Sequence, residues 1–483
     1  MTMTDVAGRT EPLLSMLVGS LMTPEPLSIA PTESVRNAAR LMRERHISCL
    51  PVCATGKLVG ILTLRDLCNR VIAVGGSVDA PVSTLMTHDP ATLPPVASAF
   101  DALLLMTQRN IGHLPVMDAG RLVGIVTNTN FLRQQTASAL FMVGDIQQCA
   151  DAAAIAAVVA QVPRLLLQLV GSGATPDQIG RMISSITDAA TRRLIALAGA
   201  ALGPAPVRYA WLACGSQGRQ EQSGVSDQDN CLILEDAYDP AQHGEWFAAL
   251  ARFVCDGLDA CGYVYCPGEM MATTPRWRQP LAVWRGYFRD WVDSPEPMAQ
   301  MLASVMFDLR VIAGDASLHE ALQAESLDRA ARNSIFVSHM VGNSLTHRPP
   351  LGLLGGLATQ RTGPHKGRID LKHAGIVPIV DIARVYALSA RIGAVNTHDR
   401  LAAGREARVL SDAGARDLLD AYAAIGGIRL RHQAAQVEAG ARPDNFLAPG
   451  ELSGLERSHL RDAFIVVRTI QRSLASRYQP AAR

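Results

Sequence analysis

Several features that would place this chain in a familiar class are missing from its sequence. Aromatic residues make up only 5% and charged residues only 18% of the 483 residues, and the formal net charge is +1. A near-neutral chain without a Lys/Arg-rich run lacks the electrostatic footprint of a protein that binds nucleic acid or an anionic membrane. We therefore expect small molecules or proteins as its partners, and no nucleic acid or membrane.

The sequence also lacks the marks of a secreted or membrane-spanning protein. Its nine cysteines form no CxxC pair and are scattered through apolar segments, which favours reduced thiols and excludes a disulfide framework or a structural zinc site. The N-terminus has no basic-then-apolar signal pattern, and the most apolar window, 152–170, is interrupted by Gln161, Pro163, Arg164 and Gln168. These absences predict a cytoplasmic protein.

What the sequence does contain is an internal repeat. Three triplets recur 64 residues later in the same order: LMT at 21–23 and 85–87, LPV at 50–52 and 114–116, and VGI at 59–61 and 123–125. Each copy is predicted to form a short strand, a helix (34–45 or 98–109), a strand at LPV, a turn, a strand at LVGI and a second helix.

This repeat resembles a pair of CBS domains over residues 18–135, with copies at 18–72 and 82–135. The family implies that AMP, ADP or ATP binds in the cleft between the copies, and that the pair forms a homodimer. Its GxxTxxD motif would supply a hydroxyl for a phosphate and a carboxylate for the ribose. No N-terminal cyclic-nucleotide domain is expected, because only about twenty residues precede the first copy.

The two copies of the GxxTxxD motif differ at the carboxylate position. In the first copy Gly60, Thr63 and Asp66 match fully, whereas in the second Thr127 is followed by Asn130. An amide still accepts a hydrogen bond from a ribose hydroxyl, but it lacks the charge that strengthens the acceptor. The alternative is that the pair serves mainly as a dimerisation block, in which Thr63 is a helix N-cap and Asp66 a first-turn acid.

An Ala- and Leu-rich connector follows the repeat over residues 137–202 and is predicted to form two or three helices. It is broken at Gly171–Gly173, after which Thr175 and Pro176 have the types of a helix cap and a first helical residue. Because rigid helices transmit a two-state shift, we hypothesise that the connector carries a signal from the repeat to the domain that follows.

The chemically richest stretch, 209–236, comes next. The apolar run 209–214 is predicted to be a strand that ends at a turn, Gly215-Ser216, whose amides are placed to cradle phosphate oxygens. A second predicted strand, 227–234, carries Asp227 and Asp229, which alternation puts on one face, where they can share Mg²⁺.

Two further residues of this stretch have a predicted role in binding phosphate. Gly218 permits close approach of the backbone to a ligand, and Arg219 has the geometry to clamp a phosphate with two hydrogen bonds.

The motif GSQGRQEQ followed by SDQDN resembles the DNA polymerase beta-type nucleotidyltransferase superfamily. Within it, the longer form is similar to a bacterial branch found beside CBS domains and related to the uridylyltransferases of the PII signal protein. The family implies that Asp227 and Asp229 bind two Mg²⁺ ions and that Gly215 and Ser216 contact the triphosphate of an NTP substrate.

Sites of this class normally use a third carboxylate, for which the sequence offers two candidates. Glu269, just after a predicted strand at 262–266, ranks slightly ahead of Asp308 as a catalytic residue. If neither reaches the metals, triphosphate binds while activation of the incoming hydroxyl suffers.

Two other enzyme classes fit this stretch poorly. A serine hydrolase needs glycine two positions before the nucleophile, where Cys214 precedes Ser216. Addition of nucleotides to RNA ends needs a basic tract, which is absent.

The C-terminal segment, 301–483, is predicted to be helical apart from a Gly- and Pro-rich interruption at 348–367, and it resembles the domain that accompanies this transferase branch. Its basic residues either face a nucleotide or partner or pair with Asp370, Asp381 and Asp420 on a solvated bundle. The basic residues concerned are Lys372, Arg384, Arg429, Arg431 and His432.

Together these patterns predict an α/β multidomain protein with the transferase domain at 203–300. The leading hypothesis is Mg²⁺-dependent transfer of NMP from an NTP to a hydroxyl, expected on a protein, under control of adenine nucleotide in the CBS pair. The alternative is a regulatory protein in which the transferase fold only senses nucleotide.

Overall fold

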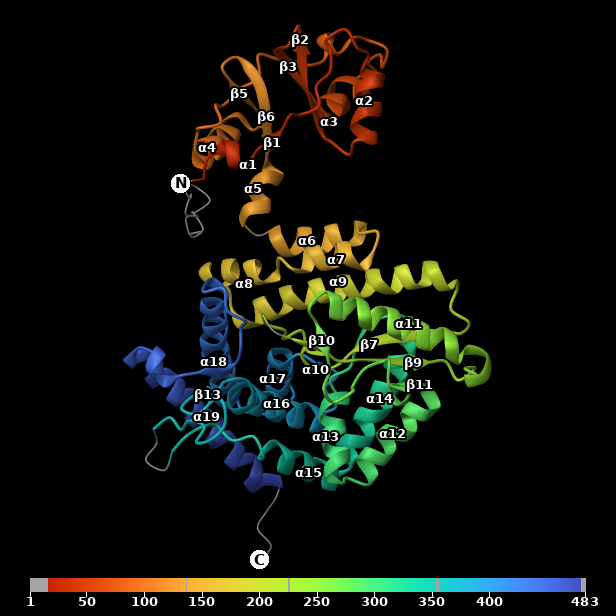
Figure 1. Cartoon of the computed structure of the whole chain (residues 1–483), viewed down its shortest axis with the longest axis vertical. Coiled ribbons are helices and arrows are strands. Elements are labelled where there is room, and N and C mark those ends of the chain that lie inside the picture. The colour runs from red at the N-terminus through yellow and green to blue at the C-terminus, as the bar shows by residue number, and fades with distance from the viewer. Residues whose placement is uncertain (1–15, 136, 225, 353–355, 479–483) are drawn as a thin grey trace, which may run out of the picture. The chain divides into compact units, whose positions relative to one another are not determined.

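The computed structural model describes residues 16–135, 137–224, 226–352 and 356–478 (Figure 1). Two compact units divide the chain, Met1–Phe141 and Met142–Arg483. Helix α6 (Ala137–Gln148) contains the boundary between them.

The first unit repeats one order of elements twice, as the sequence predicts. The first copy contains α1 (Val18–Leu21), β1 (Thr23–Pro24), α2 (Val35–Glu44), β2 (Cys49–Ala54), β3 (Lys57–Thr63), α3 (Leu64–Leu67) and η2 (Cys68–Ile72). The second contains η3 (Val82–Thr84), β4 (Thr87–His88), α4 (Ala99–Arg109), β5 (His113–Asp118), β6 (Arg121–Thr127) and α5 (Asn128–Gln135). Serine side chains at equivalent positions, Ser34 and Ser98, cap α2 and α4.

The two copies exchange their short strands, which the repeat alone does not reveal. The sheets are ordered β2-β3-β4 and β1-β6-β5, so each copy completes the sheet of the other. Glycine makes the exchange possible, because a Cβ on Gly60 would lie 2.5 Å from the sulfur of Met86, and Gly124 faces Met22 in the same way. The copies therefore fold as one interlocked body.

The second unit opens with helices α7 (Ala152–Val159), α8 (Val162–Gly171) and α9 (Pro176–Leu202). With α6 they make four helices where two or three were predicted, because the breaks before α7 and α8 lack a glycine signal. Asp151 instead caps α7, accepting from the amide of Ala154 at 2.8 Å. The predicted start of α9 is confirmed, since Thr175 forms a capping box with Gln178.

The sheet of the second unit is built from strands on both sides of the acidic motif. Its members are β7 (Tyr209–Ala213), β9 (Asn230–Leu234), β11 (Arg278–Pro280) and β12 (Arg310–Gly314), in the order β11-β9-β7-β12. A separate parallel pair joins β8 (Asp227–Gln228) to β10 (Val264–Tyr265). The single strand predicted for 227–234 is therefore two strands, because the chain changes partners at Asp229.

Helices cover this sheet and continue into the C-terminal half. They are α10 (Gly215–Gly218), α11 (Pro240–Ala260), α12 (Leu281–Asp293), α13 (Pro297–Met306), α14 (Ala316–Arg332), α15 (Ser334–Ser344), α16 (Val377–Ser389), α17 (Thr397–Glu406), α18 (Asp412–Glu438) and α19 (Gly454–Tyr478). Short elements complete the unit: η4 (Pro275–Trp277), β13 (Ile369–Asp370), η5 (Lys372–Ile376), β14 (Phe446–Leu447) and η6 (Pro449–Glu451).

One hydrophobic core runs from the sheet into the C-terminal helices. Ala210, Leu212 and Ile233 point into the same buried cluster as Ile379 of α16 and Phe464 of α19. The other face of the sheet packs on α11, where the ring of Tyr209 lies 5.7 Å from that of Phe247. Figure 1 shows α9 and α11 on one side of the sheet and α12 to α14 on the other.

Within the described ranges, one apolar segment, Ala152–Gly171, is long and apolar enough to cross a membrane by length and composition alone. One such segment is a weak indication. Here α7 packs on α9 and α11, and α8 packs on α9 and α18, through buried side chains that include Ile155, Val159, Leu165 and Leu166.

Candidate functional site

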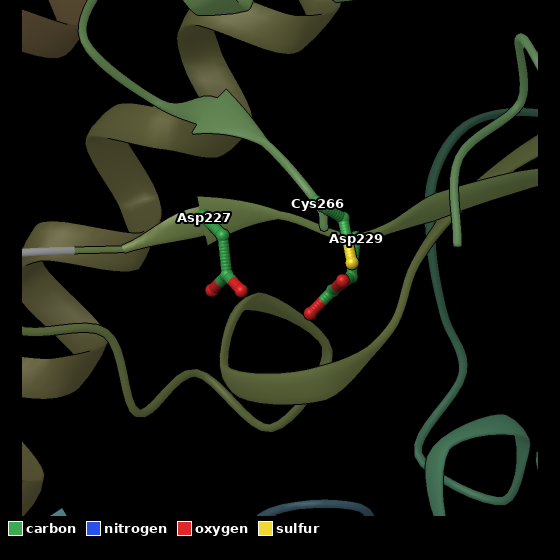
Figure 2. Close-up of side chains that lie close together, drawn as sticks. All are labelled: Asp227, Asp229 and Cys266. Carbon is green, nitrogen blue, oxygen red and sulfur yellow. The ribbon is translucent and has the colours of Figure 1, made fainter. Parts of the chain in front are cut away.

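Two carboxylates and a thiol lie close together at the junction between β8 and β9. One ligand atom from each of Asp227, Asp229 and Cys266 lies within 4.8 Å of the other two, and all three side chains are half-buried. Figure 2 shows the carboxylates of Asp227 and Asp229 pointing to the same side of the strand, with the sulfur of Cys266 beside Asp229. We call these three residues, which could hold a metal ion, the metal-ligating cluster.

Strand alternation explains why the two acidic residues share a face. The residues between and after them, Gln228 and Asn230, point the other way and are buried. Gln228 Nε2 donates to the carbonyls of Cys255 and Tyr263 at 3.0 Å each, and Asn230 Oδ1 accepts from the amide of Ala272 at 2.9 Å. These bonds hold the segment 263–272 against the motif and so fix the position of Cys266.

The turn after β7 lies against the cluster. Gly215 has a φ of +59°, and a Cβ there would lie 2.5 Å from Oδ2 of Asp229, so only glycine fits. Cys214, which precedes α10, offers no side-chain cap to the amides at the start of that helix. The turn of Gly215 and Ser216 is therefore next to the paired carboxylates, and Cys214 does not occupy the amides at the start of α10 with its side chain.

The electrostatics of the cluster favour a bound cation. Burial and the charge of Asp227 raise the pKa of Asp229 to about 6, against the lowering effects of the Cys266 hydrogen bond and of the charges on Lys372 and Arg219. Burial and the charge of Asp229 likewise raise the pKa of Cys266 to about 11. Two close carboxylates fit a hard divalent cation, whereas a protonated thiol is a poor ligand for one.

Neither candidate for the third carboxylate belongs to the cluster. Glu269 is exposed, at a turn where its φ is +54°, and it lies outside the only such group found among the described residues. Asp308 is 0% exposed and is held by three arginines. Strand β10 instead brings Cys266 beside Asp229, because Tyr265 pairs with Gln228.

The two residues predicted to bind phosphate beside the turn have other contacts. Gly218 is buried, and a Cβ there would clash with the carbonyl of Asp308, so its close approach is to the protein backbone. Arg219 uses Nε to bind Glu221 at 2.8 Å and Nη1 to bind Asp308 at 2.7 Å. Those two nitrogens are not available for a two-point contact with phosphate, because intramolecular carboxylates already occupy them.

Two open cavities, of about 400 Å³ and 410 Å³, lie beside the motifs of the repeat module. Thr63 and Asp66 line one, together with residues 110–113 of the other copy, and Thr127 and Asn130 line the other, together with residues 45–49. Both are within the size range of small-ligand sites.

In both motifs a side chain also bonds to the backbone at the start of the helix that follows, and Thr63 caps α3. Asp66 Oδ2 accepts from the amide of Thr63 at 2.9 Å, and Asn130 Oδ1 accepts from the amide of Thr127 at 2.8 Å. Thr63 and Asp66 therefore make the contacts expected of a helix cap, and the same side chains also line a cavity.

The C-terminal cations do not share one environment. Arg384 is buried against Asp381 and Asp308, Arg431 pairs with Glu456, and His432 contacts Asp444 and Glu451. Two others, Lys372 and Arg429, line a cavity beside the motif together with Ser216 and Arg219.

Sequence patterns missed Cys266, Gln228 and Asn230. The spacing of SDQDN carried a signal for the last two, since alternate residues of a strand must face inward. No local pattern marks Cys266, because its role follows only from the pairing of β10 with β8.

Two carboxylates lie beside a glycine-serine turn, in a domain that follows an interlocked repeat. This combination is that of a CBS-pair protein with a nucleotidyltransferase-type domain. The chain belongs to this family by its sequence models. Residues 160–298 match "Putative nucleotidyltransferase DUF294", residues 334–478 match "Putative nucleotidyltransferase substrate binding domain", and residues 18–73 and 82–136 match the CBS domain. The first of these models includes α8 and α9, which the sequence analysis placed in the connector.

Individual relatives match through the repeat module. The CBS domain-containing protein YhcV of Bacillus subtilis is 37% identical over 109 residues, which cover 23% of this chain and 78% of YhcV. An inosine-5'-monophosphate dehydrogenase of Korarchaeum cryptofilum is 40% identical over 109 residues, but these cover only 22% of either protein. A crystal structure of an uncharacterized conserved protein from Pyrococcus horikoshii is 31% identical, with a TM-score of 0.25, over 26% of this chain and 94% of that one.

Proposed function

We propose that this chain transfers a nucleoside monophosphate from an NTP to a hydroxyl group, with a protein as the acceptor. The observation that supports this proposal most directly is the location of the Asp227 and Asp229 carboxylates beside the Gly215 turn. One arrangement can bind a divalent cation and a triphosphate together. The family models for residues 160–298 and 334–478 point to the same reaction class.

Mg²⁺ is the proposed cofactor, held by Asp227 and Asp229. The raised pKa of Asp229, caused by burial and by the charge of Asp227, indicates two carboxylates in need of a counter-charge. When bound, Mg²⁺ supplies charge neutralisation for the phosphates and for the leaving pyrophosphate. The two carboxylates are suitable ligands for Mg²⁺, whereas Cys266, the third residue of the cluster, adds no hard ligand.

The chain's own residues would bind and orient the substrate. The amides at the start of α10 would donate to phosphate oxygens, and Ser216 would add a hydroxyl donor. The acceptor oxygen forms a bond to the α-phosphorus as the bond to the β-phosphate oxygen breaks, and the acceptor proton passes to solvent or to a carboxylate of the cluster. The products are the nucleotidylated acceptor and pyrophosphate.

A labelling experiment tests the reaction. The purified chain is incubated with cell extract, Mg²⁺ and each of ATP, UTP, CTP and GTP carrying a label on the α-phosphate. We expect a labelled protein band with one NTP and none with an Asp227→Asn variant. A band of equal intensity with that variant would refute the role of the cluster.

A second candidate function, nucleotide sensing without transfer, is favoured by one observation. The third position of the cluster is a thiol, and both candidate carboxylates lie elsewhere. A protein of this kind would bind NTP tightly but release no pyrophosphate in the presence of acceptors. Pyrophosphate release measured with each NTP separates the two functions.

Regulation by adenine nucleotide is part of the proposal. Each repeat cavity combines a threonine with an amide or carboxylate, the groups that the CBS resemblance assigns to phosphate and ribose. Within the second unit, α9 contacts the motif, because Asp188 accepts from Gln217 at 3.0 Å and from Arg310, which also bonds to the carbonyl of Gly218. We propose that α9 carries the effect of the nucleotide to this turn.

We further propose a cytoplasmic homodimer that assembles through the repeat module. All nine cysteines, which lie within the described residues, are free thiols, as expected in a reducing compartment. Phe100 and Leu104, one turn apart on α4, are 50% and 44% exposed. Such paired apolar side chains suit burial against a second copy of the chain.

A further inference from the structure

A cavity beside the metal-ligating cluster is formed jointly by the motif loop and the C-terminal helices. Its volume is about 50 Å³, well below the several hundred Å³ of a site that encloses a whole nucleoside. Its lining includes Ser216, Gln222, Ser223, Lys372 and Arg429. A cavity of this size suits only a small part of a larger ligand.

The charge of the lining selects an anion. Arg219, Lys372 and Arg429 line the cavity, and Glu221 is the only carboxylate among the described lining residues. Glu221 is already bound to Arg219 and to the amide of Thr397. Among the described residues no carboxylate lies within ion-pair distance of the Lys372 ammonium, whose charge acts on Asp229. Lys372 is thus a cation of the cavity lining without an ion-pair partner among the described residues.

An independent observation is the state of Gln222. Its side chain is 2% exposed and lines the cavity, yet neither its Oε1 nor its Nε2 has a hydrogen-bond partner among the described residues. Leaving a buried amide unpaired is costly, so such a group in a native fold usually has a ligand or ordered water as its partner. Arg429, 9% exposed, is held beside it by bonds to Asn445 and Ser223.

We infer that this cavity binds the outer phosphates of the triphosphate, with Lys372 and Arg429 of the C-terminal half as its cations and Gln222 as a neutral donor. The inference rests on the proposed function and extends it, because it makes the C-terminal half part of the nucleotide site. Arg219 then acts as a positioning residue, since its bonds to Glu221 and Asp308 hold the loop that carries Gln222.

The test measures binding of inorganic tripolyphosphate to the full chain by calorimetry in the presence of Mg²⁺. Lys372→Met removes the charge but keeps the apolar stem, and Gln222→Met removes only the amide. Lys366→Met is the matched control, because Lys366 is an exposed lysine of the same half outside the cavity. Thermal melting of each variant checks that the fold is intact.

We expect Lys372→Met to weaken tripolyphosphate binding about tenfold and Gln222→Met about threefold, as loss of a charged and of a neutral hydrogen bond implies. Lys366→Met should bind like the unmodified chain. Nucleoside monophosphates, which lack outer phosphates, should bind all four proteins equally.

Three results would overturn the inference. The first is that tripolyphosphate does not bind to the unmodified chain, and the second is that the Lys372 and Lys366 variants bind it equally well. The third is that Lys372→Met loses as much affinity for a nucleoside monophosphate as for tripolyphosphate. That result would assign the cavity to the α-phosphate or the acceptor. Failure of the proposed function has a different signature. In that case no NTP labels an acceptor, while the dependence of tripolyphosphate binding on Lys372 remains.

Discussion

Nη2 of Arg384 lies 2.6 Å from Oδ2 of Asp308, and both side chains are buried. Asp308 also binds Arg400 and Arg219, so one carboxylate joins α16 and α17 to the loop that follows the glycine-serine turn. Burial alone would raise the pKa of Asp308, but the three guanidinium groups hold it well below its usual range. This sequence candidate for a metal ligand is therefore the ion-pair centre that docks the C-terminal half.

Replacing that carboxylate should destabilise the second unit. Asp308→Asn leaves the buried Arg400 without a counter-charge and leaves Arg219 and Arg384 with one carboxylate each, and we expect it to lower the free energy of unfolding by about 3–5 kcal/mol. Chemical denaturation of the full chain measures the loss. Glu325→Gln, which breaks the exposed pair with Arg285, is the control and should cost less than about 1 kcal/mol. Equal losses in the two variants would contradict a structural role for Asp308.

The thiol at the third position of the cluster can be converted into the missing ligand. Cys266→Asp adds a hard oxygen donor beside Asp229, and we expect divalent cations to bind about tenfold more tightly, because affinity rises with the number of charged ligands. Titration with Mn²⁺ followed by electron paramagnetic resonance measures the change. Cys266→Ser, which has the size but not the charge, should leave the affinity nearly unchanged. A similar gain in both variants would show that charge at this position is irrelevant.

The first repeat site should depend on the charge of Asp66. The second repeat shows that an amide can make the same capping bonds, so Asp66→Asn should keep the melting temperature within about 2 °C while weakening AMP binding about tenfold. The reciprocal change, Asn130→Asp, should tighten binding at the second site. Calorimetry with AMP resolves both effects. If Asp66→Asn binds AMP as tightly as the unmodified chain, the carboxylate serves only as a cap.

A buried histidine gives the second unit a defined dependence on pH. Burial lowers the pKa of His319 from 6.5 to about 4, so the folded chain does not take up the proton that the unfolded chain takes up below pH 6.5. The stabilisation is complete above pH 6.5 and is lost as the pH falls towards 4, by about 3 kcal/mol. Chemical denaturation at a series of pH values between 7 and 4 gives the free energy of unfolding as a function of pH. This free energy should fall less steeply with decreasing pH in His319→Leu than in the unmodified chain. In the control, His398→Leu, an exposed histidine is replaced, and the pH dependence should match that of the unmodified chain. The same pH dependence in His319→Leu and the unmodified chain would exclude His319 as its source.

The apolar side chains on α4 predict an effect on assembly. A Phe100→Glu change introduces a charge into the proposed interface, and we expect a shift from dimer to monomer in analytical ultracentrifugation at about 10 μM protein. Leu455, another exposed apolar residue, lies in α19 of the second unit. A Leu455→Glu variant should keep the state of the unmodified chain. If Leu455→Glu dissociates into monomers, or if Phe100→Glu remains a dimer, the interface lies elsewhere.

Sequence patterns by themselves determined the features that depend on neighbours along the chain. The 64-residue repeat, the cap at Thr175 and the strand-turn-strand around Gly215 follow from periodicity and residue type. Alternation likewise put Asp227 and Asp229 on one face, where the structure has them (Figure 2).

Only the tertiary structure decided which distant residues meet. Cys266 reaches Asp229 because β10 pairs with β8, Asp308 is enclosed by arginines from α16 and α17, and the two repeats exchange their short strands. The physical reason is that such contacts come from packing across tens to hundreds of residues, which leaves no periodic trace in sequence. The donors available to a metal or a phosphate are therefore set by the fold, while the motif sets only where along the chain they gather.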